Sequence, residues 1–394
     1  MSMTRIAVLV PFLKSRATAT PASRPLGKLA LKMRNEGVEL VFCPLEAIRV
    51  TPFRTGRETH ELARDDSSRV VVDGMVAVGD RWRPVRGRAV QGGYLRVASL
   101  RRLVTLPRVS ELFRSHALPL VNTPALLRLC RDKLGFATLA EKAGLPTPPT
   151  EGDPGAMFDR LLEWGAAYFK PRHGARGRGV VRLQVEPGAI LAQSDEGAHR
   201  IPLESFPDWV STRVAREPHV LQQAVQGTRA GPGALSIRSL VQRDGEGRWV
   251  SRRAVVRFAR SGITGNVACG AEVHLLEEVR AALGGREPDE VAEAIRSLDA
   301  RVAAVIEHGL GDLAPLAVEI GVDHVLDSRG RPWVIEVNDT PQGRLGWLAG
   351  KEGRVSEREW LEVLESPIRY LVQRPPVLAR GVSAWGSSRY GASV

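Results

Sequence analysis

The chain has 394 residues, 43% of them hydrophobic and 25% charged, and 56 basic against 44 acidic residues give a formal net charge of +12. This composition is typical of globular proteins and excludes long disorder, a collagen-like repeat and a disulfide-rich miniprotein. No apolar run nears the roughly 18 residues that a spanning helix needs, and the three cysteines form no CxxC motif, so we expect a cytoplasmic protein of two or three domains without a membrane segment.

Residues 1–118 have the pattern of a small α/β domain. Strands are expected at 6–10 and 38–42, and a helix at 26–36 lies between them and ends before Gly37. Hairpins should follow, with turns at Asp73-Gly74 and Gly79-Asp80. A strand, a helix and a strand at this spacing favour a parallel sheet.

Residues 119–215 are expected to form a central lobe. Thr123-Pro124 is a helix-start signal, and the helix should continue to about residue 143, with Lys133 along it. A proline-rich connector follows the helix. The next predicted elements are a helix at 154–164, a strand at 166–170, a glycine loop at 174–179 and a strand at 180–185.

Residues 216–373 are predicted to form a C-terminal lobe, and residues 374–394 a flexible tail. The expected elements are a strand at 220–225, a hairpin made of 235–242 and 249–258, a helix at 288–308, a strand pair at 318–326 and 333–337, and an amphipathic helix that ends at 373.

The glycine loop is the first candidate for chemistry. Lys170 ends a strand, and Gly174, Gly177 and Gly179 follow it before the next strand begins. Glycines allow backbone N–H groups to turn toward an anion, and a lysine beside them can hold a phosphate. The loop is neither a P-loop nor a dinucleotide fingerprint, because a strand follows it. Taken alone, it could also be a flexible surface hairpin.

The strand pair near the C-terminus carries the second candidate site. If Arg329-Gly330 is a two-residue turn, Asp323 lies opposite Glu336, and Glu336 and Asn338 share one face. Three oxygen ligands on one face suit Mg²⁺, and two carboxylates together repel each other unless a cation neutralises them. The alternative is a polar, solvated sheet face.

Other polar residues are weaker candidates. Lys133 on a helix and Arg257 at a strand end have the positions of ordinary solvated side chains. The histidines His173, His219 and His324 have no partner at metal-ligand spacing. No nucleophile-elbow motif supports Ser-His-Asp chemistry.

Together these segments resemble the ATP-grasp superfamily, in its order and spacing, over about residues 120–345. The sequence around 249–270 and the Gln222-Gln223 segment resemble most the YheC/YheD-type, spore-coat-associated branch. The resemblance implies an α/β (α+β) fold in which two lobes clasp ATP, preceded by a small α/β domain. Two positions differ from the usual pattern: Gln223 stands where many relatives have a carboxylate, and Ser236 where Asp-x-Arg is usual.

The resemblance also implies residue roles. The implied phosphate contacts are Lys133 and Lys170, with the lid loop closing through Gly174, Gly177 and Gly179. The implied adenine contacts are backbone groups near Gln223, Ala224 and Val225. The implied magnesium ligands are Asp323, Glu336 and Asn338. Further contacts to the nucleotide or to the transferred phosphate are implied for Arg238, Arg257 and Asn266. Of these, Lys170 and Arg257 are implied to act in catalysis.

The implied activity is that of an ADP-forming, MgATP-dependent ligase that joins a carboxylate to an amine or thiol through an acyl phosphate. The substrate would be a small molecule or peptide with a carboxylate. The arginines are spread along the chain without an aromatic-basic stripe, which disfavours nucleic acid as the partner. Two other readings stay open: a kinase on the same fold, and a non-catalytic nucleotide-binding coat protein.

Overall fold

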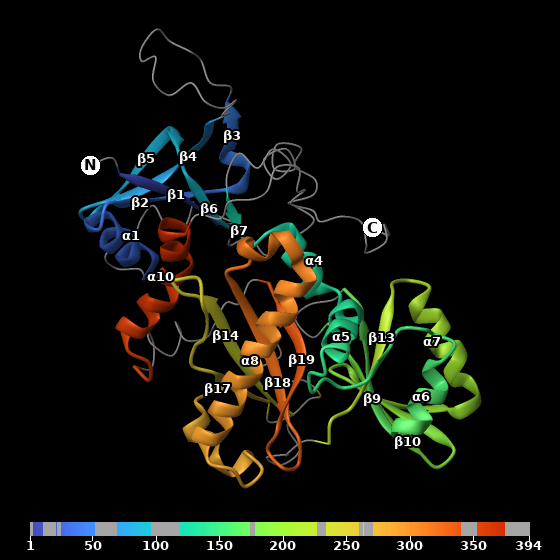
Figure 1. Ribbon diagram of the computed structural model, residues 1–394. Helices are drawn as coiled ribbons and strands as arrows, with labels where there is room; N and C mark the ends of the chain where they lie inside the picture. The colour runs from blue at the N-terminus through green and yellow to red at the C-terminus, as the bar shows by residue number, and fades with distance from the viewer. Residues whose placement is uncertain are drawn as a thin grey trace.

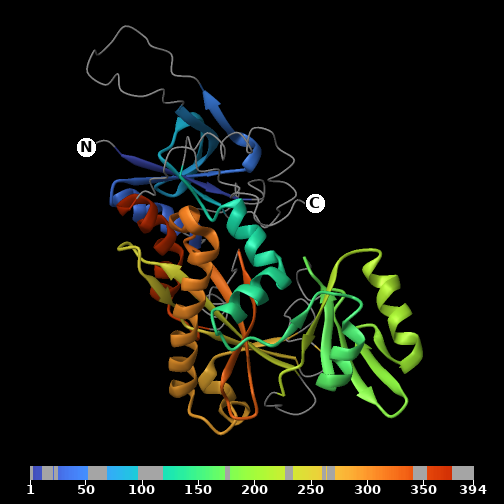
Figure 2. The ribbon, with the colours of Figure 1, turned by 45° about the vertical axis from the view of Figure 1, so that its right-hand side comes forward.

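The computed structural model describes residues 3–10, 21, 25–51, 69–95, 119–173, 178–226, 234–259, 263, 271–339 and 353–374. Within these ranges the chain forms three β-sheets, each in its own lobe (Figures 1 and 2). Gly174, Gly177, Asn266 and the tail beyond Arg374 lie outside the described residues, so the predictions made for them remain predictions.

The N-terminal sheet has the strand order β3-β4-β2-β1-β6-β7, and β5 pairs with β4. Its elements are β1 (Thr4–Leu9), α1 (Pro25–Asn35), β2 (Val38–Cys43), η2 (Leu45–Ala47), β3 (Ile48–Thr51), β4 (Arg69–Val78), β5 (Arg81–Ala89), β6 (Gly92–Leu95) and β7 (Leu120–Val121). Strands β1 and β2 are parallel and α1 connects them, which confirms the predicted strand-helix-strand unit.

The turn predicted at Asp73-Gly74 is wrong, whereas Gly79-Asp80 does join β4 to β5. Gly74 lies inside β4, where the pairing with β5 shifts register. A Cβ atom at this position would lie 2.5 Å from the carbonyl oxygen of Phe42. Glycine is therefore required here for a close approach of two backbones, and not for a reversal of the chain.

The central sheet has the order β12-β11-β10-β9-β13-β8. Its elements are β8 (Thr150–Glu151), α6 (Met157–Trp164), β9 (Ala166–Pro171), β10 (Val181–Glu186), β11 (Ala189–Ser194), β12 (Gly197–Pro202), η3 (Leu203–Ser205), α7 (Phe206–Val214) and β13 (His219–Gln223). In both views α6 and α7 cover the outer face of this sheet (Figures 1 and 2). The central lobe was expected to end at residue 215. In the structure, β13 pairs with β9, so the central sheet extends to Gln223.

The C-terminal sheet has the order β17-β16-β14-β18-β19, and β15 pairs with β14. Its strands are β14 (Ala234–Arg243), β15 (Trp249–Ser251), β16 (Val255–Ala259), β17 (Glu272–His274), β18 (Glu319–Leu326) and β19 (Pro332–Asn338). Its helical elements are α4 (Pro124–Arg131), α5 (Lys133–Lys142), η5 (Leu276–Ala282), α8 (Pro288–Leu310), η6 (Gly311–Leu316) and α10 (Glu357–Gln373). The strand predicted at 249–258 is split into β15 and β16.

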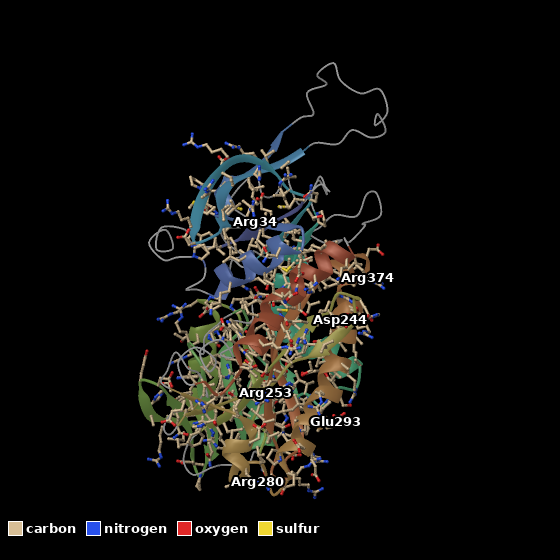
Figure 3. All side chains as sticks on the ribbon, turned by 90° about the vertical axis from the view of Figure 1, so that its left-hand side faces the viewer. Arg34, Asp244, Arg253, Arg280, Glu293 and Arg374 are labelled. Atoms are coloured by element: carbon tan, nitrogen blue, oxygen red, sulfur yellow. The ribbon has the colours of Figure 1, made fainter. Side chains whose placement is uncertain are left out.

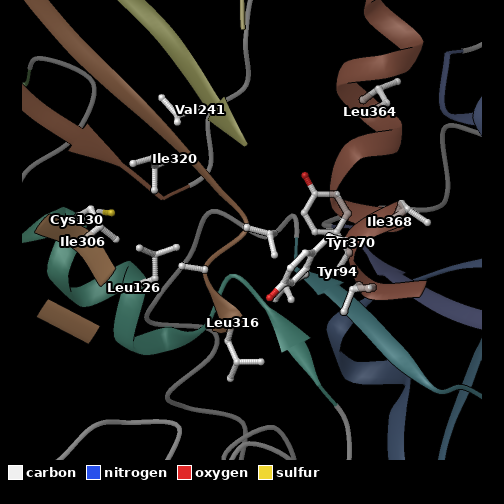
Figure 4. Close-up of a cluster of buried hydrophobic side chains, with 14 of the residues drawn as sticks. Tyr94, Leu126, Cys130, Val241, Ile306, Leu316, Ile320, Leu364, Ile368 and Tyr370 are labelled. Atoms are coloured by element: carbon white, nitrogen blue, oxygen red, sulfur yellow. The ribbon is translucent and has the colours of Figure 1, made fainter. Parts of the chain in front are cut away.

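The N-terminal and C-terminal lobes share one hydrophobic core. Tyr94 from β6 lies in the same buried cluster as Ile320 from β18 and Ile368 from α10 (Figure 4). The central lobe has a separate core, in which Phe169 and Leu221 pack against Met157 of α6 and Phe206 of α7.

Charged side chains of both signs cover the face shown in Figure 3, from Arg34 on α1 to Arg280 and Glu293 at the other end. Many of the arginines are paired with carboxylates, as Arg253 is with Glu359 at 3.2 Å. Among the described helices, none has the length and apolarity needed to cross a membrane.

Candidate nucleotide and metal site

Lys170 lies on the face of the central sheet that is opposite to α6 and α7. Its strand neighbour Phe169 points into the helix-covered core, so alternation along β9 places Lys170 on the other face. The side chain is 5% exposed, and its Nζ donates to Oε1 of Gln222 at 2.8 Å. Gln222 in turn donates to Oγ1 of Thr150 at 3.0 Å.

The ammonium group of Lys170 has no carboxylate in contact with it among the described residues. Burial lowers the pKa of Lys170 to about 8, and attraction to Glu336 opposes that shift. A buried cation held only by a neutral amide is poorly compensated. It is therefore suited to an anionic ligand.

The sequence predicted Lys133 in the middle of one long helix. In the structure, Lys133 is instead the first residue of a second helix, α5. The chain leaves the helical region at Asp132 (φ −85°, ψ 93°), and the Asp132 carboxylate accepts the N–H of Gly135 at 3.1 Å as the N-cap of α5. An aspartate cap ends one helix and begins the next. Burial lowers the pKa of Lys133, and attraction to Glu336 opposes the shift.

Asp323 is clamped by two arginines. Arg238 donates from Nε to its Oδ1 at 2.6 Å and from Nη2 to Oδ2, and Arg257 contacts Oδ1 at 2.8 Å. Although burial alone would raise it, these guanidinium groups hold the pKa of Asp323 well below its usual range. The expectation that only a bound cation could neutralise the carboxylates is therefore wrong for Asp323.

Asp323 does lie opposite Glu336, but for a different reason than predicted. Residues 327–331 connect β18 to β19, and the N–H of Asp327 donates to the carbonyl of Arg331 at 2.9 Å, which leaves a three-residue loop at 328–330. A bulge then leaves Ile335 unpaired, so that His324 faces Val334 and Asp323 faces Glu336. The bulge compensates for the extra loop residue and returns Glu336 to the predicted register.

Glu336 is half-buried and forms no hydrogen bond or ion pair with any residue that the structure describes. Its neighbour on the same face, Asn338, donates from Nδ2 to Oδ2 of Asp323 at 3.3 Å. Within the described ranges, no three His, Cys, Asp or Glu side chains gather as a metal-binding group. The predicted set has two carboxylates and an amide, and Glu336 is the member whose carboxylate oxygens have no partner among the described residues and could bind a cation.

Of the three backbone N–H groups predicted to contact adenine, two already donate hydrogen bonds within the central lobe. The N–H of Gln223 donates to Pro149 at 2.9 Å, and that of Ala224 donates to Ala166 at 3.0 Å. The N–H of Val225 has no backbone acceptor in the described part of the chain. Of the lid glycines only Gly179 is described, and its φ of +71° requires glycine.

Arg172 and Asp132, which lie close to the two lysines along the chain, were not identified from the sequence. Arg172, which follows β9, makes a two-pronged ion pair with Asp132 at 2.6 Å for both contacts. The signal for Asp132 was available, because an aspartate three residues before a glycine N–H is an N-cap pattern. No sequence signal indicates that Arg172 is its partner.

Two of the histidines are packed within the fold, with contacts to neighbouring side chains. His324 is buried behind the sheet and contacts Ser239 Oγ at 3.1 Å and Asp299 Oδ1 at 3.0 Å. His219 stacks on Phe169, with ring centroids 4.4 Å apart.

Two solved structures share this architecture. An ATP-grasp ligase associated with a ribosomally made peptide, from Chryseobacterium gregarium and in complex with ADP and a leader and core peptide, superposes with a TM-score of 0.53 at 11% identity, over 92% of this chain and 95% of that one. D-cycloserine synthetase superposes with a TM-score of 0.50 at 17% identity, over 92% of this chain and 100% of that one. At this identity the likeness shows the fold alone.

Sequence relatives are found in Bacillus subtilis strain 168. The endospore coat-associated protein YheD is 26% identical over 194 residues, which is 47% of this chain and 42% of the relative. YheC, also endospore coat-associated, is 23% identical over 210 residues, or 52% of this chain and 55% of the relative. The chain thus spans about half the length of the curated relatives that it matches.

The family model for the YheC/D-like ATP-grasp proteins matches residues 146–370, which is more than half of the chain. This stretch contains Lys170 and the complete β18–β19 hairpin. The chain therefore belongs to the YheC/D-like ATP-grasp family and has the ATP-grasp fold.

Proposed function

We propose that this protein is an ADP-forming, MgATP-dependent ligase that joins a carboxylate to an amine or a thiol. The observation that carries the proposal is that Lys170, a buried cation held by a neutral amide, lies within electrostatic reach of Glu336, a carboxylate without a partner among the described residues. Phosphoryl transfer needs cations that spread the phosphate charge and ligands for a metal, and this arrangement supplies both.

Lys133 and Lys170 would hold the phosphates of ATP, and the hinge at Gln223, Ala224 and Val225 would contact adenine. Glu336, with Asn338, would hold magnesium, which when bound would neutralise phosphate charge and orient the reacting group. Asp323 was also expected to be a ligand, but its oxygens already accept from Arg238 and Arg257, so its role would be to hold these arginines. Arg257 and Arg238 hold the pKa of Asp323 low and would place cationic charge beside the reacting phosphoryl group.

The substrate carboxylate would attack the γ-phosphorus and release ADP. The amine or thiol would then attack the acyl carbon and release phosphate. Enclosure of the site between the sheets would protect the acyl phosphate from water. The peptide-associated ligase and D-cycloserine synthetase support a peptide or small-molecule carboxylate as the substrate class.

The test is turnover of MgATP with a panel of amino acids and short peptides, followed by product analysis. A ligase yields ADP, phosphate and a new amide or thioester, whereas phosphate retained on the product would show a kinase. A chain that binds ATP but turns over none of the panel, and that assembles on spore coats, would favour a structural role like that suggested by the names of the curated relatives.

Two carboxylate variants provide the matched controls. Glu336→Gln should lower turnover by orders of magnitude and leave folding stability within about 0.5 kcal/mol, since Glu336 has no partner to lose. Asp323→Asn should also cost about 3 kcal/mol of folding stability, because it leaves Arg238 and Arg257 without their carboxylate. Unchanged turnover in Glu336→Gln would contradict the metal role.

A further inference from the structure

An ion pair between two lobes lies directly beside the two phosphate lysines. Arg172 donates from Nε to Oδ1 of Asp132 and from Nη2 to Oδ2, both at 2.6 Å. The backbone N–H of Lys133 also donates to the carbonyl of Arg172, at 3.1 Å. Three hydrogen bonds therefore join the start of α5 to the end of β9.

The two partners belong to separately packed parts of the molecule. Helix α5 is anchored in the shared core through Phe136 and Ala140, whereas β9 belongs to the central sheet with its own core. Asp132 immediately precedes Lys133, and Arg172 follows Lys170 by two residues. The junction therefore joins the two backbone segments that carry Lys133 and Lys170.

Both ends of the junction are rigid. Asp132 is held by the N–H of Gly135 as well as by Arg172, and the N–H of Arg172 donates to Pro218 at 2.8 Å. Although burial alone would raise it, the hydrogen bonds from Arg172 and Gly135 lower the pKa of Asp132. A two-pronged Arg–carboxylate contact fixes direction as well as distance.

The ion pair also opposes the electrostatic repulsion between Lys133 and Lys170. The positive charge of Lys133 contributes to lowering the pKa of Lys170, so the two ammonium groups repel each other before a ligand arrives. Without a tie between α5 and β9, this repulsion would favour a wider separation of the lobes. A polyphosphate that must touch both lysines would then have to draw them together at a cost in affinity.

We propose that Asp132 and Arg172 are positioning residues that hold Lys133 and Lys170 at the spacing required by the phosphates of a nucleotide. The inference rests on the proposed function, because it takes both lysines as phosphate contacts. It adds two residues that do not touch the nucleotide themselves. The adenine-binding hinge lies at the other end of β9 and is independent of this ion pair.

The experiment is calorimetric titration of the full chain with MgATP and, separately, with adenosine. Asp132→Asn keeps an N-cap for α5 but removes the charge, and Arg172→Gln removes the other partner. Each variant should bind MgATP roughly tenfold more weakly, since a small misplacement of binding groups is costly, and should bind adenosine as the wild type does. The double variant should be no weaker than either single one.

Arg200→Gln is the matched control. Arg200 lies in the same lobe and pairs with Glu186 at 2.9 Å, but it is largely exposed and distant in sequence from both lysines. It should leave both affinities unchanged. If Arg172→Gln does not fold, Arg172→Lys keeps the charge without the fork and should weaken MgATP binding several-fold, again with adenosine binding unchanged.

The variant Lys170→Ala distinguishes failure of the proposed function from failure of the positioning role alone. If Lys170→Ala binds MgATP as tightly as the wild type, the phosphate role and the proposed function fail together. If Lys170→Ala weakens MgATP binding but Asp132→Asn and Arg172→Gln do not, the positioning role alone is overturned. Equal weakening of MgATP and adenosine in the ion-pair variants would also overturn it, because it would indicate a general loss of structure.

Discussion

At the scale of single residues, the site contrasts two kinds of charged side chain. Asp323 is fully engaged by Arg238 and Arg257, whereas Lys170 is held only by the amide of Gln222. In the first arrangement, the negative charge of the carboxylate is compensated within the protein. The second leaves a buried charge that destabilises the fold until an anion binds. The cost of keeping Lys170 buried should therefore be measurable.

Replacement of Lys170 by Met keeps a flexible apolar stem and removes the charge. Below the lowered pKa of about 8, the folded lysine is charged and unfavourably buried. Between about pH 8 and the unfolded value near 10.4, the unfolded state binds more protons than the folded state, so wild-type stability rises with pH through this group. Lys170→Met should thus be more stable than the wild type at pH 7, by up to roughly 3 kcal/mol.

The measurement is urea denaturation of both proteins at pH 7, 8, 9 and 10. The stability difference should be largest at pH 7 and should shrink steadily above pH 8, because only the wild type carries this proton. If the stability difference between the two proteins is the same at every pH, the pKa of Lys170 is not lowered in the folded protein.

At the scale of elements, the β18–β19 hairpin decides whether the candidate metal ligands meet. The three-residue loop and the bulge at Ile335 act together, since either one alone would place Glu336 one position away from Asp323. The loop is itself tightly placed. Gly330 has φ +71°, and a Cβ there would lie 2.4 Å from the carbonyl oxygen of Leu283.

Gly330→Ala should therefore destabilise the protein by about 2 kcal/mol or more, from backbone strain together with the clash against η5. Gly285→Ala is the matched control, because Gly285 also has a positive φ of +78° but nothing lies within 4 Å of its added Cβ. That control should cost only about 1 kcal/mol. Equal losses in the two variants, measured by urea denaturation, would show that the contact with Leu283 has no effect.

At the scale of the whole molecule, the N-terminal and C-terminal lobes pack together in the described part of the chain, whereas the central lobe has a core of its own. The N-terminal and C-terminal lobes share a core, and Tyr94 of β6 hydrogen-bonds to the buried Glu319 of β18. Asn122 joins the same region by donating to the carbonyls of Glu319 at 2.9 Å and Asp339 at 2.8 Å. The central lobe, with its own core, should open independently.

Tyr94→Phe should lower the stability of the shared unit by about 1–3 kcal/mol, because Glu319 loses a buried hydrogen-bond donor. Hydrogen exchange in increasing urea should show this loss in β1, β6, β18 and β19, with no change in β9, β10 and β13. Tyr168→Phe, on the central sheet, serves as the control and should leave the shared unit unaffected. A loss of equal size in both sets of strands would mean that the molecule unfolds as one unit.

Local patterns in the sequence predicted many of the helices and strands that the structure describes, and they indicated Lys170, Glu336 and Asn338 as candidate site residues. Period-two alternation placed Glu336 and Asn338 on one face, and the lysine that ends β9 was recognisable beside its glycines. These properties depend on near neighbours in the chain, so a single sequence contains them. The family resemblance rested on the same short motifs, and the match over residues 146–370 confirms it.

Only the tertiary structure decided how charges were matched across the lobes. The clamp on Asp323 joins residues 66 and 85 positions apart, and the Asp132–Arg172 pair spans 40 positions. No periodicity links such partners, because their proximity depends on strand pairing and lobe packing. The same reason explains the membership of β13 in the central sheet, because its pairing with β9 is a contact between distant segments that local propensity does not contain.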